Sequence, residues 1–421
     1  MAKREKAILQ GKREKTLKLK KLRVKRRNVL ILAMAMFIAN VSFGMAFPYL
    51  SVYMRLLGAS MFMVGLLSVA FNLTSTVFQY PFGWLSDSTG NRKTFIAFGV
   101  ASIGLFYTAM AFVGSATGVL ILRTLQGIFG SAMTPAHSAL ISELSTRAGS
   151  IFGLFNSIEN AGYMVGNFLG SVIVGYLGIK KLFILSGFLL FISAGIVLLI
   201  RERPTGRRSL LGMILVQEGR ESWRATVRSS AFKKLMRGHL GIFYITVFLV
   251  MVASGQFYSV SSVYFKETFG EWSVGVIFGI ESLAAALTGY SLGKLIDRYG
   301  AKRFYLLAIA GYAVAFLLYA FVKNVWLVFG VAFLSGVKWV MTTNSTSAYV
   351  AQNVRVGERA QGMGLLNAMM SLGWVVGPLI GGYLAGISFT LDFVSTIVPL
   401  SIAFILASGL PEKYGVETNG G

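Results

Sequence analysis

The chain has 421 residues, of which 55% are apolar and only 13% are charged. That charged fraction is about half of the value for an average soluble domain. The formal net charge of +24 would suit nucleic-acid binding, but the basic residues gather between long apolar runs, which indicates membrane topology instead. The sequence has no cysteine, and its two histidines lie far apart, so we expect no disulfide, metal, cofactor or nucleic-acid partner.

Residues 1–28 form a strongly basic segment with 13 lysines and arginines. The apolar run that follows from Val29 is too long for the core of a signal peptide, so we expect a first membrane span there. The basic segment could contact anionic lipid headgroups, but such a charge run is more often simply solvated. We therefore favour a disordered tail that only fixes topology.

Twelve apolar runs of about 20 residues follow one another, and each can cross a bilayer as a helix. The alternation typical of outer-membrane strands is absent, and helices satisfy their own backbone hydrogen bonds in lipid. We predict an all-α membrane protein with twelve transmembrane helices at residues 29–54, 61–85, 94–114, 117–141, 150–177, 181–200, 239–265, 272–296, 303–322, 325–350, 361–386 and 390–409.

The distribution of Lys and Arg predicts the orientation. Segments on the side of the N-terminal tail hold 32 of these residues, the opposite loops hold five, and three lie within spans. Because basic residues accumulate in the cytoplasm, we expect both termini there, in a multi-pass plasma-membrane protein. The predicted parts are a cytoplasmic tail (1–28), two six-helix halves (29–200 and 239–410), a cytoplasmic linker (201–238) and a C-terminal tail (411–421).

The linker contains Pro204, ten basic residues and the apolar patch LLGMIL from Leu210 to Leu215. Part of it could form a helix on the membrane surface, with Trp223 and Val227 on one face. A flexible tether between the halves fits the sequence equally well.

The two halves repeat each other at an offset of 209 to 211 residues. GLFN at residues 153–156, for example, aligns with GLLN at residues 364–367. Several independent matches within two residues of one offset are not expected by chance. Two six-span halves in parallel repeat are typical of transporters whose substrate site lies between the halves near the bilayer midplane.

With these matches in view, the chain resembles the major facilitator superfamily over nearly its whole length. GWLSDSTGNRK, which follows the second span, and its second copy GKLIDRYGAKR are similar to that family's Gly-x-x-x-Asp-Arg-x-Gly-Arg-Lys signature. The first copy has Ser88 where an Arg is usual and Asn91 after Gly90. The resemblance implies a latch between the halves in the outward-facing state, formed by a gating motif of Gly83, Asp87, Gly90, Arg92, Gly293, Asp297, Arg298, Gly300 and Lys302.

Two further motifs carry the resemblance. RTLQG, beginning at Arg123, is similar to the family's Arg-x-x-Gln-Gly pattern and implies a role in proton coupling or domain movement. The alternative is an arginine that extends to the membrane interface.

GYMVGNFLGS in the fifth span resembles the antiporter motif, although Asn167 replaces a Pro, and the intact form GWVVGPLIGG lies in the eleventh span. Small residues at this spacing let helices approach closely, which predicts helix contacts at Gly162, Gly166, Gly170, Gly373, Gly377, Pro378 and Gly381.

Four ionisable side chains lie well inside predicted spans: Arg123, Glu159, Glu281 and Lys338. Each costs roughly 2.5–3.5 kcal/mol at a helix centre, so each should face a cavity or a partner. The residues at the equivalent positions of the other half are apolar. The fold therefore does not require these charges, which favours a functional role for them. We predict that Glu159, Glu281 or both bind a proton or cation, and that Lys338 pairs with them or with an anionic substrate; a purely structural ion pair is the alternative.

Polar residues at helical spacing predict the faces that line a cavity. On the fifth span one stripe holds three asparagines (Asn156, Asn160 and Asn167) and Tyr163, beside the stripe of glycines. The second, seventh and tenth spans carry similar stripes. The predicted cavity-lining polar residues are Asn72, Gln79, Asn156, Asn160, Tyr163, Gln256, Thr342 and Ser345.

These features predict a secondary active transporter rather than an enzyme, because the sequence has no catalytic or metal-binding constellation. Its many Phe, Met and Tyr residues favour proton-coupled export of drug-like or amphipathic molecules by a monomer, as the twelve-span drug:proton antiporters perform it. Two alternatives stay open: proton-coupled uptake of a sugar or other organic solute, and a non-transporting sensor with a transporter fold.

Overall fold

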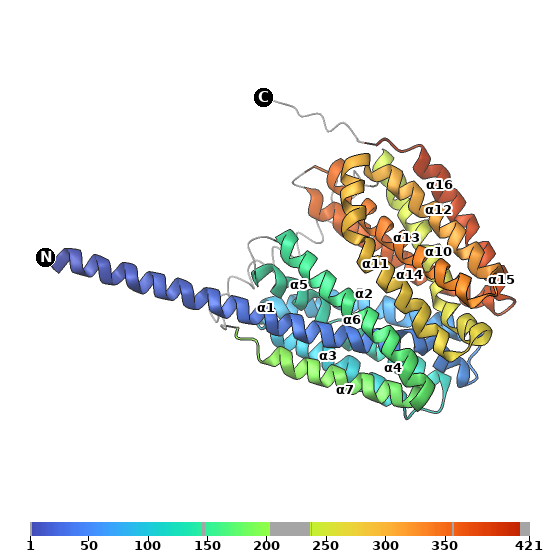
Figure 1. The fold of residues 1–421 in the computed structure, drawn as a ribbon, viewed down its shortest axis with the longest axis horizontal. Coiled ribbons are helices and arrows are strands. Elements are labelled where there is room, and N and C mark those ends of the chain that lie inside the picture. The colour runs from blue at the N-terminus through green and yellow to red at the C-terminus, as the bar shows by residue number, and fades with distance from the viewer. Residues whose placement is uncertain (1, 145–147, 203–235, 237, 356–357, 413–421) are drawn as a thin grey trace.

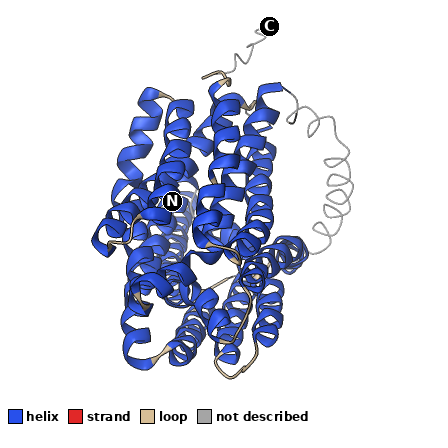
Figure 2. Ribbon diagram, turned by 90° about the vertical axis from the view of Figure 1, so that its right-hand side faces the viewer, coloured by secondary structure: helices blue, strands red, loops and turns tan. Residues whose placement is uncertain are grey.

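The structure is a computed structural model, which describes residues 2–144, 148–202, 236, 238–355 and 358–412. All regular secondary structure in these residues is helical (Figure 2). The N-terminal half contains α1 (Ala2–Leu56), α2 (Met61–Thr89), α3 (Arg92–Met110), α4 (Ala116–Gly130), α5 (Met133–Leu144), α6 (Ala148–Leu177) and α7 (Ile179–Leu198). The C-terminal half contains α10 (Gly238–Phe269), α11 (Glu271–Tyr299), α12 (Ala301–Phe321), α13 (Val325–Asn353), α14 (Arg359–Ala385), α15 (Phe389–Ser395) and α16 (Ile397–Ser408).

Ten segments of the described chain are long and apolar enough to cross a membrane, with α15 and α16 together forming the tenth. The α4–α5 pair and α6 occupy the two remaining predicted spans. α6 has 30 residues, and its asparagines and Glu159 reduce its mean hydropathy. The linker prediction, including the surface helix around Trp223, lies outside the described residues.

The predicted boundaries differ from the structure at two kinds of position. First, α1 begins at Ala2, so the expected disordered tail is wrong: residues 2–28 continue the first span as helix (Figure 1). This segment is rich in Lys, Arg, Glu and Leu and has no proline, a composition that favours helix. Second, the fourth and twelfth spans are each broken into two helices. Pro135 and Pro399 lie in the first turn of the helix after each break, where a missing N–H is tolerated.

The two halves meet at one end of the molecule and diverge at the other (Figure 1). We call the end with the 57–60 turn and Gly270 the outer end, and the end with both termini the inner end. At the outer end the hydroxyl of Tyr49 accepts a hydrogen bond from Gly275 N at 3.2 Å and donates one to Glu271 O at 3.3 Å. An ion pair between Arg55 and Glu267, with Nε and Oε1 3.7 Å apart, joins the halves at the same end.

Helix pairs α2–α14 and α6–α11 form the main contacts between the halves. Toward the inner end, α11 instead exposes large side chains, with Leu287 64% and Tyr290 76% accessible. The contacts at one end and the exposure at the other define a conformation that is closed at the outer end and open at the inner end.

The predicted helix-packing glycines lie at contacts within each half. A Cβ on Gly166 would overlap the backbone of Val41 on α1, and a Cβ on Gly377 would overlap that of Val252 on α10. The other four glycines of the set meet the same two helices. Their missing side chains allow α1–α6 and α10–α14 to pack backbone against backbone.

The turns of the two gating motifs depend on glycine. Gly90 ends α2 with φ +64°, and Gly300 ends α11 with φ +101°. An L-residue with a side chain rarely adopts these conformations, which explains why both motifs have a glycine at the turn.

Candidate functional site

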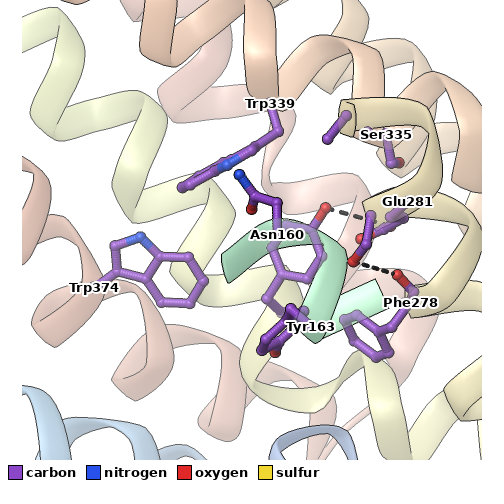
Figure 3. A pocket seen from close by; sticks show the side chains of 11 residues that line it. Asn160, Tyr163, Phe278, Glu281, Ser335, Trp339 and Trp374 are labelled. Carbon is purple, nitrogen blue, oxygen red and sulfur yellow. Dashed lines mark hydrogen bonds between the residues drawn. The ribbon is translucent and has the colours of Figure 1, made fainter. Parts of the chain in front are cut away.

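A cavity of about 290 Å³ lies between the two halves (Figure 3). We call it the central cavity. α6 contributes Asn160 and Tyr163 from the first half, and the other lining residues come from the second half. These are Tyr258 on α10, Phe278, Glu281, Ser282 and Ala285 on α11, Ser335, Gly336 and Trp339 on α13, and Trp374 on α14. Glu281 is the one carboxylate in this lining, and five of the eleven lining residues are aromatic.

The hydroxyl of Tyr258 links Glu281 to Lys338, and Tyr319 also contacts Glu281. Tyr258 donates a hydrogen bond to the Glu281 carboxylate at 3.4 Å, and Tyr319 donates another at 3.1 Å. Lys338 Nζ donates to the hydroxyl of Tyr258 at 3.1 Å. The predicted pairing of Lys338 with Glu281 therefore occurs through Tyr258, and no direct salt bridge between them is seen in the described structure.

Aromatic rings enclose the ammonium group of Lys338. Its Nζ lies 3.9 Å from the ring centre of Tyr312, 5.0 Å from that of Phe316 and 5.2 Å from that of Tyr258. Lys338 is 1% exposed, whereas Glu281 is 9% exposed and faces the cavity. Cation–π attraction and the tyrosine bridge stabilise the buried ammonium, and they leave Glu281 as the group that an entering molecule meets first.

A second cavity of about 270 Å³ lies within the N-terminal half, and we call it the arginine cavity. Its lining consists of Phe43, Phe47, Phe71, Ser75, Ile103, Tyr107, Arg123, Gly130, Met133, Thr134 and Tyr163. Arg123 is 4% exposed, so the alternative that it extends to the membrane interface is wrong. Its guanidinium group donates to Gln126 and lies 3.9 Å from the ring centre of Phe71. Tyr163 lines both cavities.

Glu159 lies apart from both cavities. Its carboxylate Oε1 is 3.4 Å from Nε2 of His137 on α5, but the two groups are not aligned as a hydrogen bond. His137 is 8% exposed and its ring packs edge-on against Phe155. Glu159 therefore does not share the central cavity with Glu281, and its neighbouring basic group is His137 on α5.

The other predicted polar residues are distributed unevenly. Asn160 and Tyr163 line the central cavity, whereas Thr342 and Ser345 are buried on the face of α13 that carries Lys338. Gln256 lines neither cavity: its amide donates to Asp392 Oδ1 at 2.9 Å and to Ser395 Oγ at 2.7 Å, so its expected cavity position is corrected. The linings of these two cavities also do not include Asn72, Gln79 and Asn156.

The gating motifs lie at the inner end, where their contacts stay within each half. Arg92 pairs with Asp87, and its Nε is 3.5 Å from Glu143 Oε1. In the second half Lys302 donates to Ser408 O at 2.8 Å. A Cβ on Gly293 would lie 3.8 Å from Asn344 Nδ2, which is an ordinary contact, so this glycine does not mark a close approach of two helices. These contacts leave the halves apart at the inner end.

Sequence reasoning missed the tyrosines and tryptophans that complete the site. Tyr258 and Tyr319 hold Glu281, and Trp339 and Trp374 wall the central cavity. Aromatic residues are common in the packed interior of membrane helices, so their abundance did not indicate which of them line a cavity. Asp392, which is fully buried against Gln256, was missed as an ionisable residue because it lies near the end of a predicted span.

Two repeated helical halves, closed at one end around internal cavities, define a membrane transporter of alternating-access architecture. The sequence model of the Major Facilitator Superfamily matches residues 32–271 and 243–419 of the chain. The chain belongs to the Major Facilitator Superfamily, and the predicted family, fold class and absence of enzyme function are confirmed by that membership.

Several relatives and solved structures are similar to this chain. An uncharacterized MFS-type transporter of Methanocaldococcus jannaschii is 27% identical over 371 residues, which cover 86% of this chain and 92% of the relative. Multidrug resistance protein MdtG of Salmonella heidelberg is 24% identical over 392 residues, covering 87% and 90%.

Among solved structures, the nucleoside transporter NupG has a TM-score of 0.73 at 15% identity, covering 90% of this chain and 97% of NupG. A bacterial homologue of the human lysosomal transporter Spinster, in an inward-facing and unoccupied conformation, has a TM-score of 0.72 at 14% identity, covering 93% and 99%. At these identities the likeness shows the fold alone.

Proposed function

We propose that the chain is a secondary active transporter that exports drug-like or amphipathic small molecules in exchange for protons. The observation that carries the proposal is the central cavity, in which a single carboxylate, Glu281, faces a wall of aromatic side chains between the two halves. Aromatic walls accept varied apolar bodies, and the carboxylate supplies one titratable contact. The similarity to MdtG, named as a multidrug resistance protein, supports the substrate class.

Glu281 is suited to exchange a proton for a substrate. Burial disfavours a lone carboxylate, so this group needs a proton, a hydrogen-bond donor or a positive charge beside it. A hydrogen-bond donor or a positive charge on the substrate would replace the proton on Glu281, because the proton and the substrate group occupy the same carboxylate oxygens. Tyr258 and Tyr319 orient the carboxylate for that exchange, and Lys338 stabilises its ionised form through Tyr258.

The proposal also includes orientation and assembly. The excess of Lys and Arg at the inner end supports a cytoplasmic location for both termini in the plasma membrane. With that orientation the conformation described above is inward-facing. Each cavity is formed within one chain, which supports a monomer as the working unit.

Uptake of a sugar or another organic solute is a second candidate. It is favoured by Trp339, Trp374 and Asn160 around Glu281, since tryptophans and amides are common in sugar sites. Direction of proton movement separates the two candidates, because uptake would carry the proton and the solute together.

Vesicle transport tests the proposal. The purified protein in proteoliposomes, with a pH dye inside, is given amphipathic zwitterions, lipophilic cations, sugars and amino acids under an imposed proton gradient. We expect an amphipathic compound to drive opposite proton movement in the wild type and not in Glu281→Gln. Asp392→Asn, which neutralises a buried carboxyl outside both cavities, should retain it. Proton movement in the same direction as a sugar would favour uptake, and no flux of any compound would favour a sensor.

A further inference from the structure

Arg123 is a buried cation for which the scaffold supplies no anion. No acidic side chain lines the arginine cavity, and no salt bridge to Arg123 is seen in the part of the chain that the structure describes. Its partners are neutral: Nη1 donates to the amide oxygen of Gln126, and the Tyr107 hydroxyl also interacts with the guanidinium group, whereas Nε has no hydrogen-bond partner. A buried guanidinium with free donors is unfavourable, and an anion that fits its fork restores the missing partners.

The repeat indicates that this charge is not needed for the fold. The equivalent position in the second half is Ala332, which is fully buried on α13. α13 therefore packs at the matching place without an arginine. The Phe71 ring beside the guanidinium group also keeps one of its faces from water.

The size of the arginine cavity suits part of a ligand. Complete binding sites for drug-sized molecules have volumes of about 300–1,000 Å³, which are larger than the 270 Å³ of the arginine cavity. Tyr163 forms a shared wall with the central cavity, so one elongated molecule can reach both. The remaining lining is mostly apolar, with the hydroxyl groups of Ser75 and Thr134 as further donors.

We propose that the arginine cavity is an anion subsite, which binds the carboxylate or a similar oxyanion of a zwitterionic amphipathic substrate. The acidic group takes the free donors of Arg123, and the rest of the molecule passes Tyr163 into the central cavity. There its amine, which is the positive end, meets Glu281. This inference rests on the proposed function, to which it adds the chemical class of the substrate.

A matched probe pair tests the subsite. Nα-dansyl-lysine and dansylcadaverine share the fluorophore, the chain and the terminal amine. They differ by one carboxylate, which in Nα-dansyl-lysine lies at the opposite end of the chain from the amine. Binding to the full-length protein in nanodiscs is followed by energy transfer from tryptophan to dansyl. We expect the wild type to bind dansyl-lysine at least tenfold more tightly, the ratio expected for a charge-assisted hydrogen bond. Arg123→Gln should bring the ratio close to one while retaining dansylcadaverine binding, and Arg123→Lys should keep part of it.

Two further variants keep the result decisive. Arg201→Gln removes an exposed arginine outside both cavities and should leave the ratio unchanged. Thr134→Glu places a carboxylate in the arginine cavity, so it should abolish the preference even if Arg123→Gln does not fold. Equal binding of both probes by the wild type, or a preference that survives in Arg123→Gln, would overturn the subsite. In either case, persistent proton exchange with dansylcadaverine in vesicles would leave the proposed function standing.

Discussion

The hydroxyl of Tyr258 is the only described group that contacts both Glu281 and Lys338, accepting from the ammonium and donating to the carboxylate. Hydrogen bonds to charged groups contribute about 1.5–3 kcal/mol, or roughly a ten- to hundredfold change in an equilibrium. We therefore expect Tyr258→Phe to reduce substrate-driven proton flux in vesicles by at least tenfold.

Tyr312→Phe is the matched control for that prediction. Its ring lies beside the Lys338 ammonium group, but its hydroxyl does not bridge Lys338 and Glu281, so the ring contact survives the change. We expect a much smaller loss of flux than in Tyr258→Phe. Equal losses in the two variants would show that the bridge through the Tyr258 hydroxyl has no special role.

Glu159 gives a second prediction about coupling. Its side chain is 26% exposed and its Oε1 lies 3.4 Å from Nε2 of His137, so it is placed to take protons from the open inner end. We expect Glu159→Gln to abolish transport driven by a pH gradient while substrate exchange without a gradient continues. Unchanged gradient-driven transport would remove Glu159 from the coupling pathway and leave Glu281 alone in that role.

The contact between α6 and α11 holds the outer end closed. A Cβ on Gly275 would lie 2.8 Å from Ser171 Cβ and 2.9 Å from Ser171 N, which is too close for either to stay in place. Overpacking of this kind costs about 1–3 kcal/mol, enough to shift the balance between two conformations. We expect Gly275→Ala to lengthen spin-label distances between the 57–60 and 322–324 turns and to slow transport several-fold.

Gly289 on the same helix supplies the control. The nearest atom to a Cβ there is Val340 Cγ1, at 3.9 Å, so Gly289→Ala should change neither the distances nor the transport rate. The sequence has no cysteine, so pairs of introduced thiols can be labelled without background. Unaltered distances in Gly275→Ala would contradict the role of this contact in closing the outer end.

The positions of the membrane-spanning helices were predicted more accurately than the breaks within them. Apolar length alone placed the spans, because a bilayer requires about 20 residues for each crossing. The breaks before Pro135 and Pro399 were missed, although Pro48, Pro81 and Pro378 lie inside continuous helices. A proline in a membrane helix thus either bends or ends it according to the packing around it, which hydropathy does not contain.

The asymmetry of the two halves is the main property of the whole molecule. The repeat predicted a shared scaffold, and the ionisable side chains that depart from it pointed to Arg123, Glu159, Glu281 and Lys338. The sequence did not predict which of these four side chains lie close together, because that depends on how the helices are oriented and on which helix faces meet. Glu281 and Lys338 come together through a tyrosine on a third helix, whereas Glu159 and Arg123 lie elsewhere.

Alternating access requires the inner end to close as the outer end opens, and the gating motifs are placed for that change. In the conformation that is open at the inner end, Arg92 and Lys302 are held by partners in their own halves. Exchange of these contacts for contacts across the halves would form the latch expected in the outward-facing state. In the proposed mechanism, the proton on Glu281 and the substrate control which closure is favoured.

Proton release on binding tests the central claim most directly. The purified protein in weakly buffered detergent solution is mixed with the compound that gives the largest vesicle response, and the pH is recorded. Exchange at Glu281 predicts a release of protons that saturates with ligand and disappears in Glu281→Gln, with Asp392→Asn behaving as the wild type. Saturable binding without proton release in the wild type, or release that persists in Glu281→Gln, would contradict the account.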